Sequence, residues 1–476
     1  MEHSALSKSA QRQQMPLFKG ALAVFVFLSA IYLLSIDIRA SYGASITGDE
    51  PFYLVTTQSL LNDGDLDLSN QFSRSTYSSF FDHADGLWMQ SRNVPGKPLL
   101  SPHNPGLSIF LIPGFYFGEL LGSQIQMVLI AGATFALAFV IVSKLTGRWF
   151  STFWLTFALG ITAPSFIYSS EIYPEIPASF FLLLVLLILT NSRRVGALKA
   201  VTLTILISLL PWLGVKYAVI AFMLGCYTFY LCKPKEKWLF ASFSIISLLA
   251  YVYFHLSTFG GLTPYNVNIV YEDMSSSKIF VEHFVFSDRV YRIWGLFIDQ
   301  RFGLFRWAPV LLICIAGIPL MMRSKFIGKL MFALFCTQIF IASFVVITMM
   351  GWWFPGRTLI TCIPLLLAPL VFVWTIAPVS FRILIILLIT HSVFITIALT
   401  IAGYNRDVVV AVNPYELEAL VFSATQLLFP DYTSWDFHTW ITTTIWMLLF
   451  TGLAVISKRM LVAFRYHFGT KFKHEL

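Results

Sequence analysis

The chain's series of apolar runs, each close to the length that crosses a lipid bilayer, most constrains its fold. The first run, "ALAVFVFLSAIYLLSI", covers residues 21–36, and a helix needs about 20 apolar residues to cross the bilayer core. Only 12% of the residues are charged and 57% are hydrophobic, whereas about a quarter of the residues of a soluble domain are charged. The pattern therefore predicts an all-α polytopic membrane protein.

Twelve segments have the composition expected of membrane spans. They lie near 20–38, 123–143, 149–169, 175–190, 197–213, 215–231, 238–257, 308–322, 327–348, 359–376, 380–402 and 437–456. The basic stretch before the first of them is also typical of a signal peptide, but the many later spans favour an uncleaved helix.

The positions of lysine and arginine indicate how the apolar segment "GLSIFLIPGFYFGELLG" (106–122) is used. If this segment lies flat at the membrane, every later basic loop falls on the cytoplasmic side, as the positive-inside rule requires. Under that topology 20 of the 32 Lys and Arg residues, but only three of the 24 acidic ones, are cytoplasmic. We therefore expect twelve spans, with both termini in the cytoplasm.

Three long loops then face the other side of the membrane. The first covers about residues 39–122, the second 258–307 and the third 403–436. The first loop is rich in Asp, aromatic and turn residues, and we expect juxtamembrane helices inside it. Because the net charge of +8 is explained by the cytoplasmic loops, nucleic acid is not an expected partner.

Two adjacent carboxylates, Asp49 and Glu50, stand in "SITGDEPFYL" shortly after the first span. In one interpretation Asp49 only caps a helix that begins at Pro51, since proline suits the first turn of a helix. A carboxylate at this depth can also accept a proton from a hydroxyl group.

A second acidic pair, Glu171 and Glu175, lies in "SSEIYPEIP" at the mouth of the next pair of spans. The two prolines free backbone groups, which is tolerated at membrane depth only beside protein or water. An ordinary helix kink with solvated acids is the alternative interpretation.

Four basic residues are candidates for binding an anionic group. Lys216 in "PWLGVKYA" lies between two apolar runs without an acid nearby in sequence, and a lysine at membrane depth costs roughly 2.5–3.5 kcal/mol. Arg301 and Arg306 in "DQRFGLFRWAP" and Arg357 in "GWWFPGRT" lie on the outer side, where positive charge is least expected. Arginine binds phosphate through a bidentate fork. Snorkelling of the lysine and interfacial anchoring of the arginines remain alternatives.

Two further candidates, Lys97 and His103, lie in the proline-rich stretch "PGKPLLSPHNPG". A structural role in this proline-rich turn is one interpretation of both residues, and contact with a substrate is the other.

Five stretches in this order resemble the GT-C superfamily of membrane glycosyltransferases, and its branch with protein O-mannosyltransferases and lipid A aminoarabinose transferases in particular. They are "TGDEPFYLVTTQSLLNDGDLDL", "KPLLSPHNPGLSIFLIPGFYFG", "SSEIYPEIPASFF", "PWLGVKYA" and "RFGLFRWAP". The resemblance implies a GT-C fold, with a catalytic module over residues 1–310 and further transmembrane helices over 311–476.

The resemblance also implies roles for the candidate residues. The first-loop aspartate of the family corresponds to Asp49, the general base, and an acid in the next, short outer link (169–177) to Glu171 or Glu175. The family's membrane-embedded lysine corresponds to Lys216, near the donor phosphate. The implied reaction moves a sugar from a polyprenyl-phosphate carrier to an extracytoplasmic acceptor such as lipopolysaccharide, a cell-wall glycan, a lipid-linked glycan or a protein.

The chemistry that the resemblance implies matches the residue types present. A carboxylate deprotonates the acceptor hydroxyl while cations stabilise the departing phosphate, and direct displacement inverts the anomeric centre. Lys and Arg can replace a metal, so no cofactor is required, although some GT-C members use a divalent ion. We expect a bacterial inner-membrane enzyme whose active site faces the periplasm.

A transporter or flippase of a lipid-linked glycan is the main alternative. In a transporter we expect charged residues buried in the middle of the spans, and no large first loop is needed. Here the candidate residues gather on one face of the membrane instead.

Overall fold

The computed structural model describes residues 2–271, 274–283 and 285–472, and in these the chain is all-α. Seven helical segments are long and apolar enough to cross a membrane: Met15–Ser35, Gly106–Thr146, Pro234–Val267, Phe326–Val345, Arg357–Ile376, Val379–Asn405 and Phe437–Phe464. Four shorter apolar helical segments accompany them: Glu175–Thr190, Ala197–Leu213, Val215–Leu231 and Leu311–Met322. The prediction of a polytopic helical membrane protein agrees with this architecture.

The helices that form these segments have the following bounds. The N-terminal half contains α1 (Glu2–Tyr32), α4 (Gly106–Thr146), α5 (Trp149–Gly160), α7 (Glu175–Thr190), α8 (Ala197–Leu213), α9 (Ala218–Leu231) and α10 (Pro234–Phe259). The C-terminal half contains α14 (Leu311–Met322), α15 (Phe326–Phe340), η8 (Arg357–Leu366), α16 (Leu367–Ile376), α17 (Val379–Asn405) and α19 (Phe437–Phe472).

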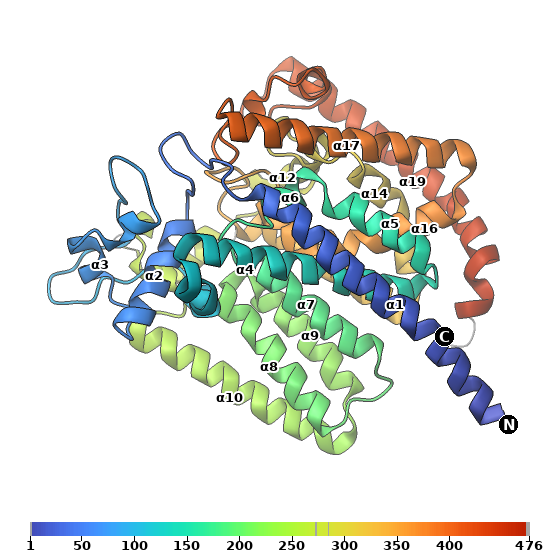
Figure 1. Ribbon diagram of the computed structural model, residues 1–476, viewed down its shortest axis with the longest axis horizontal. Coiled ribbons are helices and arrows are strands. Elements are labelled where there is room, and N and C mark those ends of the chain that lie inside the picture. The colour runs from blue at the N-terminus through green and yellow to red at the C-terminus, as the bar shows by residue number, and fades with distance from the viewer. Residues whose placement is uncertain (1, 272–273, 284, 473–476) are drawn as a thin grey trace.

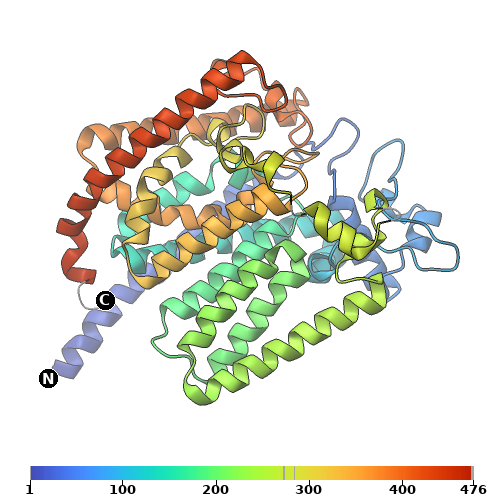
Figure 2. The same ribbon diagram turned by 180° about the vertical axis from the view of Figure 1, so that it is seen from behind.

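Shorter helices lie in the connecting segments. They are α2 (Glu50–Asn62), α3 (Ser69–Ser73), α6 (Ala163–Ile167), α11 (Ser276–His283), α12 (Arg292–Ile298), α13 (Leu304–Trp307) and α18 (Leu420–Ser423). The loops with α2 and α3 project from one end of the bundle, and the start of α1 and the end of α19 lie at the other (Figures 1 and 2).

The expected span at 149–169 differs from the structure. The helix α5 has only 12 residues, and the chain bends before the five-residue helix α6 begins. The residue after the bend, Pro164, lies at the start of α6, where a missing N–H is tolerated.

Most of the segment 106–122 forms the first arm of α4, and the helix bends sharply before the segment ends. Gly118 and Glu119 have non-helical backbone angles, and the φ of Glu119 is +44°. The side-chain amide of Gln126 joins the two arms, because it donates to the carbonyl of Phe110 and accepts from the N–H of Gly114. The segment is therefore separated from the span that follows it.

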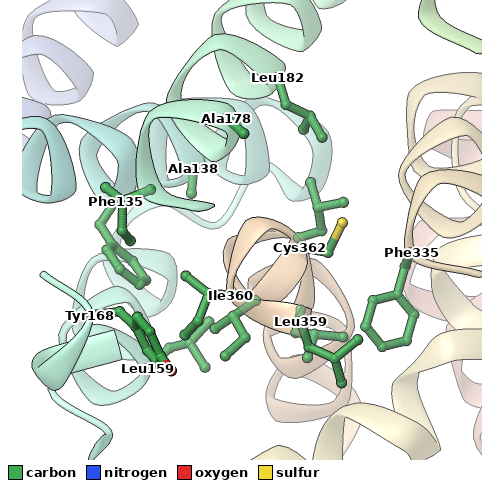
Figure 3. Packing of buried hydrophobic residues seen from close by; sticks show 14 of the residues in the cluster. Phe135, Ala138, Leu159, Tyr168, Ala178, Leu182, Phe335, Leu359, Ile360 and Cys362 are labelled. Carbon is green, nitrogen blue, oxygen red and sulfur yellow. The ribbon is translucent and has the colours of Figure 1, made fainter. Parts of the chain in front are cut away.

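The central element of the bundle is the continuous segment formed by η8 and α16. In the most apolar stretch of this segment 83% of the residues are buried inside the protein, whereas the figure for the corresponding stretch of Pro234–Val267 is 11%. Figure 3 shows its side chains Leu359, Ile360 and Cys362 among buried residues of the surrounding helices. The helix α16 also packs against α4 and α5, so the C-terminal part of the chain contributes the centre of the core. The predicted domain boundary near residue 310 stays a prediction.

Candidate functional site

Four charged side chains from distant parts of the chain form one continuous network. Arg357 donates from Nη2 to Asp49 Oδ2 at 2.7 Å and from Nε to Glu175 Oε1 at 3.1 Å. Lys216 Nζ donates to the same Glu175 oxygen at 2.5 Å. Two carboxylates and two cations thus balance each other in charge, in a site where Glu175 and Arg357 are buried and Asp49 and Lys216 are partly buried.

Each member of the network stands at the N-terminal end of a helix. Asp49 directly precedes α2, and Glu175 is the first residue of α7. Lys216 lies in the short turn before α9, and Arg357 is the first residue of η8. Unpaired N–H groups and the helix dipole make such ends favourable for anions.

Asp49 occupies the helix-cap position without capping through its side chain. Its backbone carbonyl accepts from the N–H groups of Phe52 and Tyr53, but its carboxylate makes no capping hydrogen bond and turns to Arg357. Burial by itself would raise the pKa of Asp49, but Arg357 and His103 outweigh it and lower the pKa to about 2. The carboxylate is therefore ionised at any physiological pH.

Aromatic rings hold the guanidinium of Arg357 from its sides. Its central carbon lies 3.8 Å from the ring centroid of Tyr173 and 5.0 Å from that of Trp353. Such cation–π contacts fix the plane of the guanidinium. Tyr173 had no predicted role, although it stands between the two predicted acids of "SSEIYPEIP".

His103 of the first outer loop lies next to Asp49 at the edge of the network. Its Nε2 lies 3.8 Å from Asp49 Oδ1 and 2.8 Å from Gln90 Oε1. Burial lowers the pKa of His103 despite the nearby carboxylate, so the ring is neutral at neutral pH. Gln90 was missed, because no sequence signal distinguishes it from other polar loop residues.

Glu50 and Glu171 lie next to this network in a separate pair. Glu50 accepts from the N–H of Thr47 at 3.0 Å and from that of Ile172 at 2.9 Å. Burial raises the pKa of Glu50 to about 7, although both hydrogen bonds lower it. Both oxygens of Glu171 are buried without a hydrogen-bond partner among the described residues.

Three further predicted residues lie outside both the network and the pair Glu50–Glu171. Arg306 is buried and donates to the carbonyls of Gln300 and Phe422, while Arg301 lies 3.6 Å from Asp431. Both arginines therefore join the second outer loop to the third. Lys97 is exposed.

Lys216, which has no acid nearby in sequence, pairs with an acid in the structure. Its partner Glu175 is 41 positions away, too far for the sequence to indicate the pair. Among the described residues, no group of three or more His, Cys, Asp or Glu side chains is arranged to hold a metal ion.

A glycine with positive φ directly precedes each residue of the ion pair between Asp49 and Arg357. Gly48 (φ +62°) precedes Asp49, and Gly356 (φ +91°) precedes Arg357. A Cβ at Gly48 would lie 2.8 Å from the hydroxyl of Tyr173 and 2.9 Å from the backbone oxygen of Trp352. Glycine is therefore needed there for conformation and for space.

Gly48→Ala is expected to weaken the ion pair between Asp49 and Arg357. A non-glycine residue in the left-handed region costs roughly 1–2 kcal/mol, and the crowding against Trp352 adds to that. The matched control is Gly64→Ala, at φ +75° with no atom within 4 Å of the added Cβ. Thermal unfolding of the two variants should give the larger loss for Gly48→Ala. Equal losses would show that the contact with Trp352 is unimportant.

The chain was compared with protein-family models, with curated proteins and with solved structures, and none of them matches it.

Proposed function

We propose that this protein is an integral membrane glycosyltransferase that moves a sugar from a polyprenyl-phosphate donor to an extracytoplasmic acceptor, with inversion. The observation that carries the proposal is the network Asp49–Arg357–Glu175–Lys216. It combines a carboxylate suited to accept a proton with two cations suited to a phosphate. The GT-C resemblance of the surrounding sequence supports the same assignment.

In this proposal the residues divide the chemistry between the two sides of the anomeric carbon. Asp49 takes the proton of the acceptor hydroxyl, whose oxygen forms the new bond to the anomeric carbon. The bond from that carbon to the phosphate oxygen breaks, and its electron pair leaves with the polyprenyl phosphate. Lys216 and Arg357 stabilise the anionic leaving group.

The ion pair between Asp49 and Arg357 implies that binding of the sugar donor makes Asp49 a stronger base. A carboxylate whose pKa is about 2 is a weak proton acceptor at neutral pH. A donor phosphate that attracts Arg357 loosens its contact with Asp49, and the pKa of Asp49 then rises towards its ordinary value. The donor therefore binds before the acceptor is activated.

The bilayer is the expected source of the donor. A polyprenyl chain stays in the membrane, and the network lies at the ends of apolar helices. We place the active site on the periplasmic side of a bacterial inner membrane, with lipopolysaccharide, another glycan or a protein as the acceptor.

Mass spectrometry of envelope glycans and polyprenyl-phosphate sugars tests the proposal. A strain that lacks the protein should lose one sugar from a glycan and accumulate the corresponding polyprenyl-phosphate sugar. Purified protein in liposomes should then consume that donor and release polyprenyl phosphate when the acceptor is added. Movement of an intact lipid-linked sugar across the bilayer, without its consumption, would instead establish the flippase alternative.

A further inference from the structure

A small cavity next to the charged network contains the second pair of carboxylates. The volume of this cavity that water can occupy is about 20 Å³. The polar residues that line it are Ser35, Ser45, Glu50, Gln124, Ser170 and Glu171. The remaining lining residues are apolar. Among the described residues, no lysine, arginine or histidine therefore lines the cavity. A cavity of this size has room for about one water molecule.

The two carboxylates differ in their hydrogen bonds. Each oxygen of Glu50 accepts a backbone N–H, from Thr47 and from Ile172, and such bonds stabilise the ionised form. Glu171 is 92% buried, since its exposed fraction is 8%, and neither oxygen has a partner among the described residues. An ionised carboxylate in this state would cost several kcal/mol.

We propose that Glu50 and Glu171 hold a single proton between them, that this proton is on Glu171, and that the pair acts as a pH-sensitive clasp between the first outer loop and the short outer link at 169–177. The cavity lining supplies no positive side chain to balance two negative charges, so one carboxylate takes up a proton instead. The inference does not depend on the proposed glycosyl transfer.

The clasp connects the two segments that carry the catalytic network. Glu50 contacts the N–H of Ile172, and the hydroxyl of Tyr173 donates to the carbonyl of Thr47 at 3.2 Å. Asp49 lies between Thr47 and Glu50 in the first segment, and Glu175 follows Tyr173 by two residues in the second. Ionisation of Glu171 would place two like charges in the cavity and drive the segments apart.

The groups that face Glu171 agree with this assignment. Burial raises the pKa of Glu171 well above its ordinary value of 4.5, as do the charges of Glu50 and Glu175, and only Arg357 opposes them. The phenols of Tyr168 and Tyr173 also lie nearby. For an acid whose pKa is raised by folding, stability is complete below its unfolded pKa and is lost as pH rises through the folded value.

The test is thermal unfolding of the full chain in nanodiscs from about pH 5 to pH 9, with wild type, Glu171→Gln and the exposed control Glu418→Gln. Wild type and Glu418→Gln should lose stability as the pH rises. Glu171→Gln should show a smaller slope, because only Glu50 of the pair still has a raised pKa, and should exceed wild type at high pH. Infrared difference spectra should show a protonated-carboxyl band near neutral pH that Glu171→Gln removes.

Two results would overturn the inference. One is a wild-type pH slope and carboxyl band that persist undiminished in Glu171→Gln. The other is a rise in the unfolding temperature of wild type with CaCl₂, absent in Glu171→Gln, because the neutralising ion would then be a metal. If Glu171→Gln does not fold, the wild-type infrared band alone decides, and its absence near pH 6 contradicts the proposal.

Discussion

Asp49→Asn is expected to lower the rate of sugar transfer by about 10²- to 10⁴-fold, the usual contribution of a general base. The amide has the size of the carboxylate and its oxygen can still accept from Arg357, which also retains Glu175 at 3.1 Å. The fold should therefore survive, and the loss should appear in kcat.

The measurement is turnover of the polyprenyl-phosphate sugar by purified variants, together with their unfolding temperatures. Asp85→Asn is the matched control, because Asp85 lies in the same outer loop with a 92% exposed side chain, and it should behave as wild type. Full activity of Asp49→Asn would leave Asp49 without a catalytic role and direct attention to Glu175 or Glu171.

The pH profile gives an independent check on the state of Asp49. Because its pKa is about 2 in the free protein, kcat/KM should show no acidic limb from this group above about pH 4. When Arg357 contacts the donor phosphate instead of Asp49, the pKa of Asp49 rises. We therefore expect kcat to fall at acidic pH.

The sequence predicted the type of fold because membrane helices follow directly from composition. Apolar runs and the distribution of Lys and Arg need no tertiary information. The break between α5 and α6 was missed because 149–169 is mainly apolar and contains no charged residue, and such a composition does not distinguish a straight span from a bent one. Gly160 and Pro164 are the local signals of the break. The central position of 357–376 likewise depends on packing between helices.

The four residues of the network were each selected as candidates from the sequence, but their contacts with one another were not predicted. Asp49 and Arg357 are 308 positions apart, and chemistry alone identified both as unusual charges near a membrane. The same argument selected Arg301 and Arg306, which join two loops instead. A charge in an unfavourable place indicates that a partner exists, but the sequence does not say which one.

Arg357→Met is expected to destabilise the protein by about 3–5 kcal/mol, the cost of leaving a buried charge without its partner. Asp49 loses its 2.7 Å contact, and Glu175 keeps only Lys216. Arg357→Lys should recover little, because an ammonium cannot contact both carboxylates through a planar fork. Sugar transfer should be lost in both variants.

A double-mutant cycle separates the ion pair from simple loss of packing. If the destabilisation of Arg357→Met comes from the unpaired carboxylate, adding Asp49→Asn removes that charge and should restore part of the stability. Contacting charges of this kind give interaction energies of about 0.5–3 kcal/mol. Additive losses in the double variant would mean that Arg357 acts mainly through its stacking on Tyr173 and Trp353. The proposed exchange of Arg357 from Asp49 to a donor phosphate would then lose its basis, since the guanidinium would not be restraining the base.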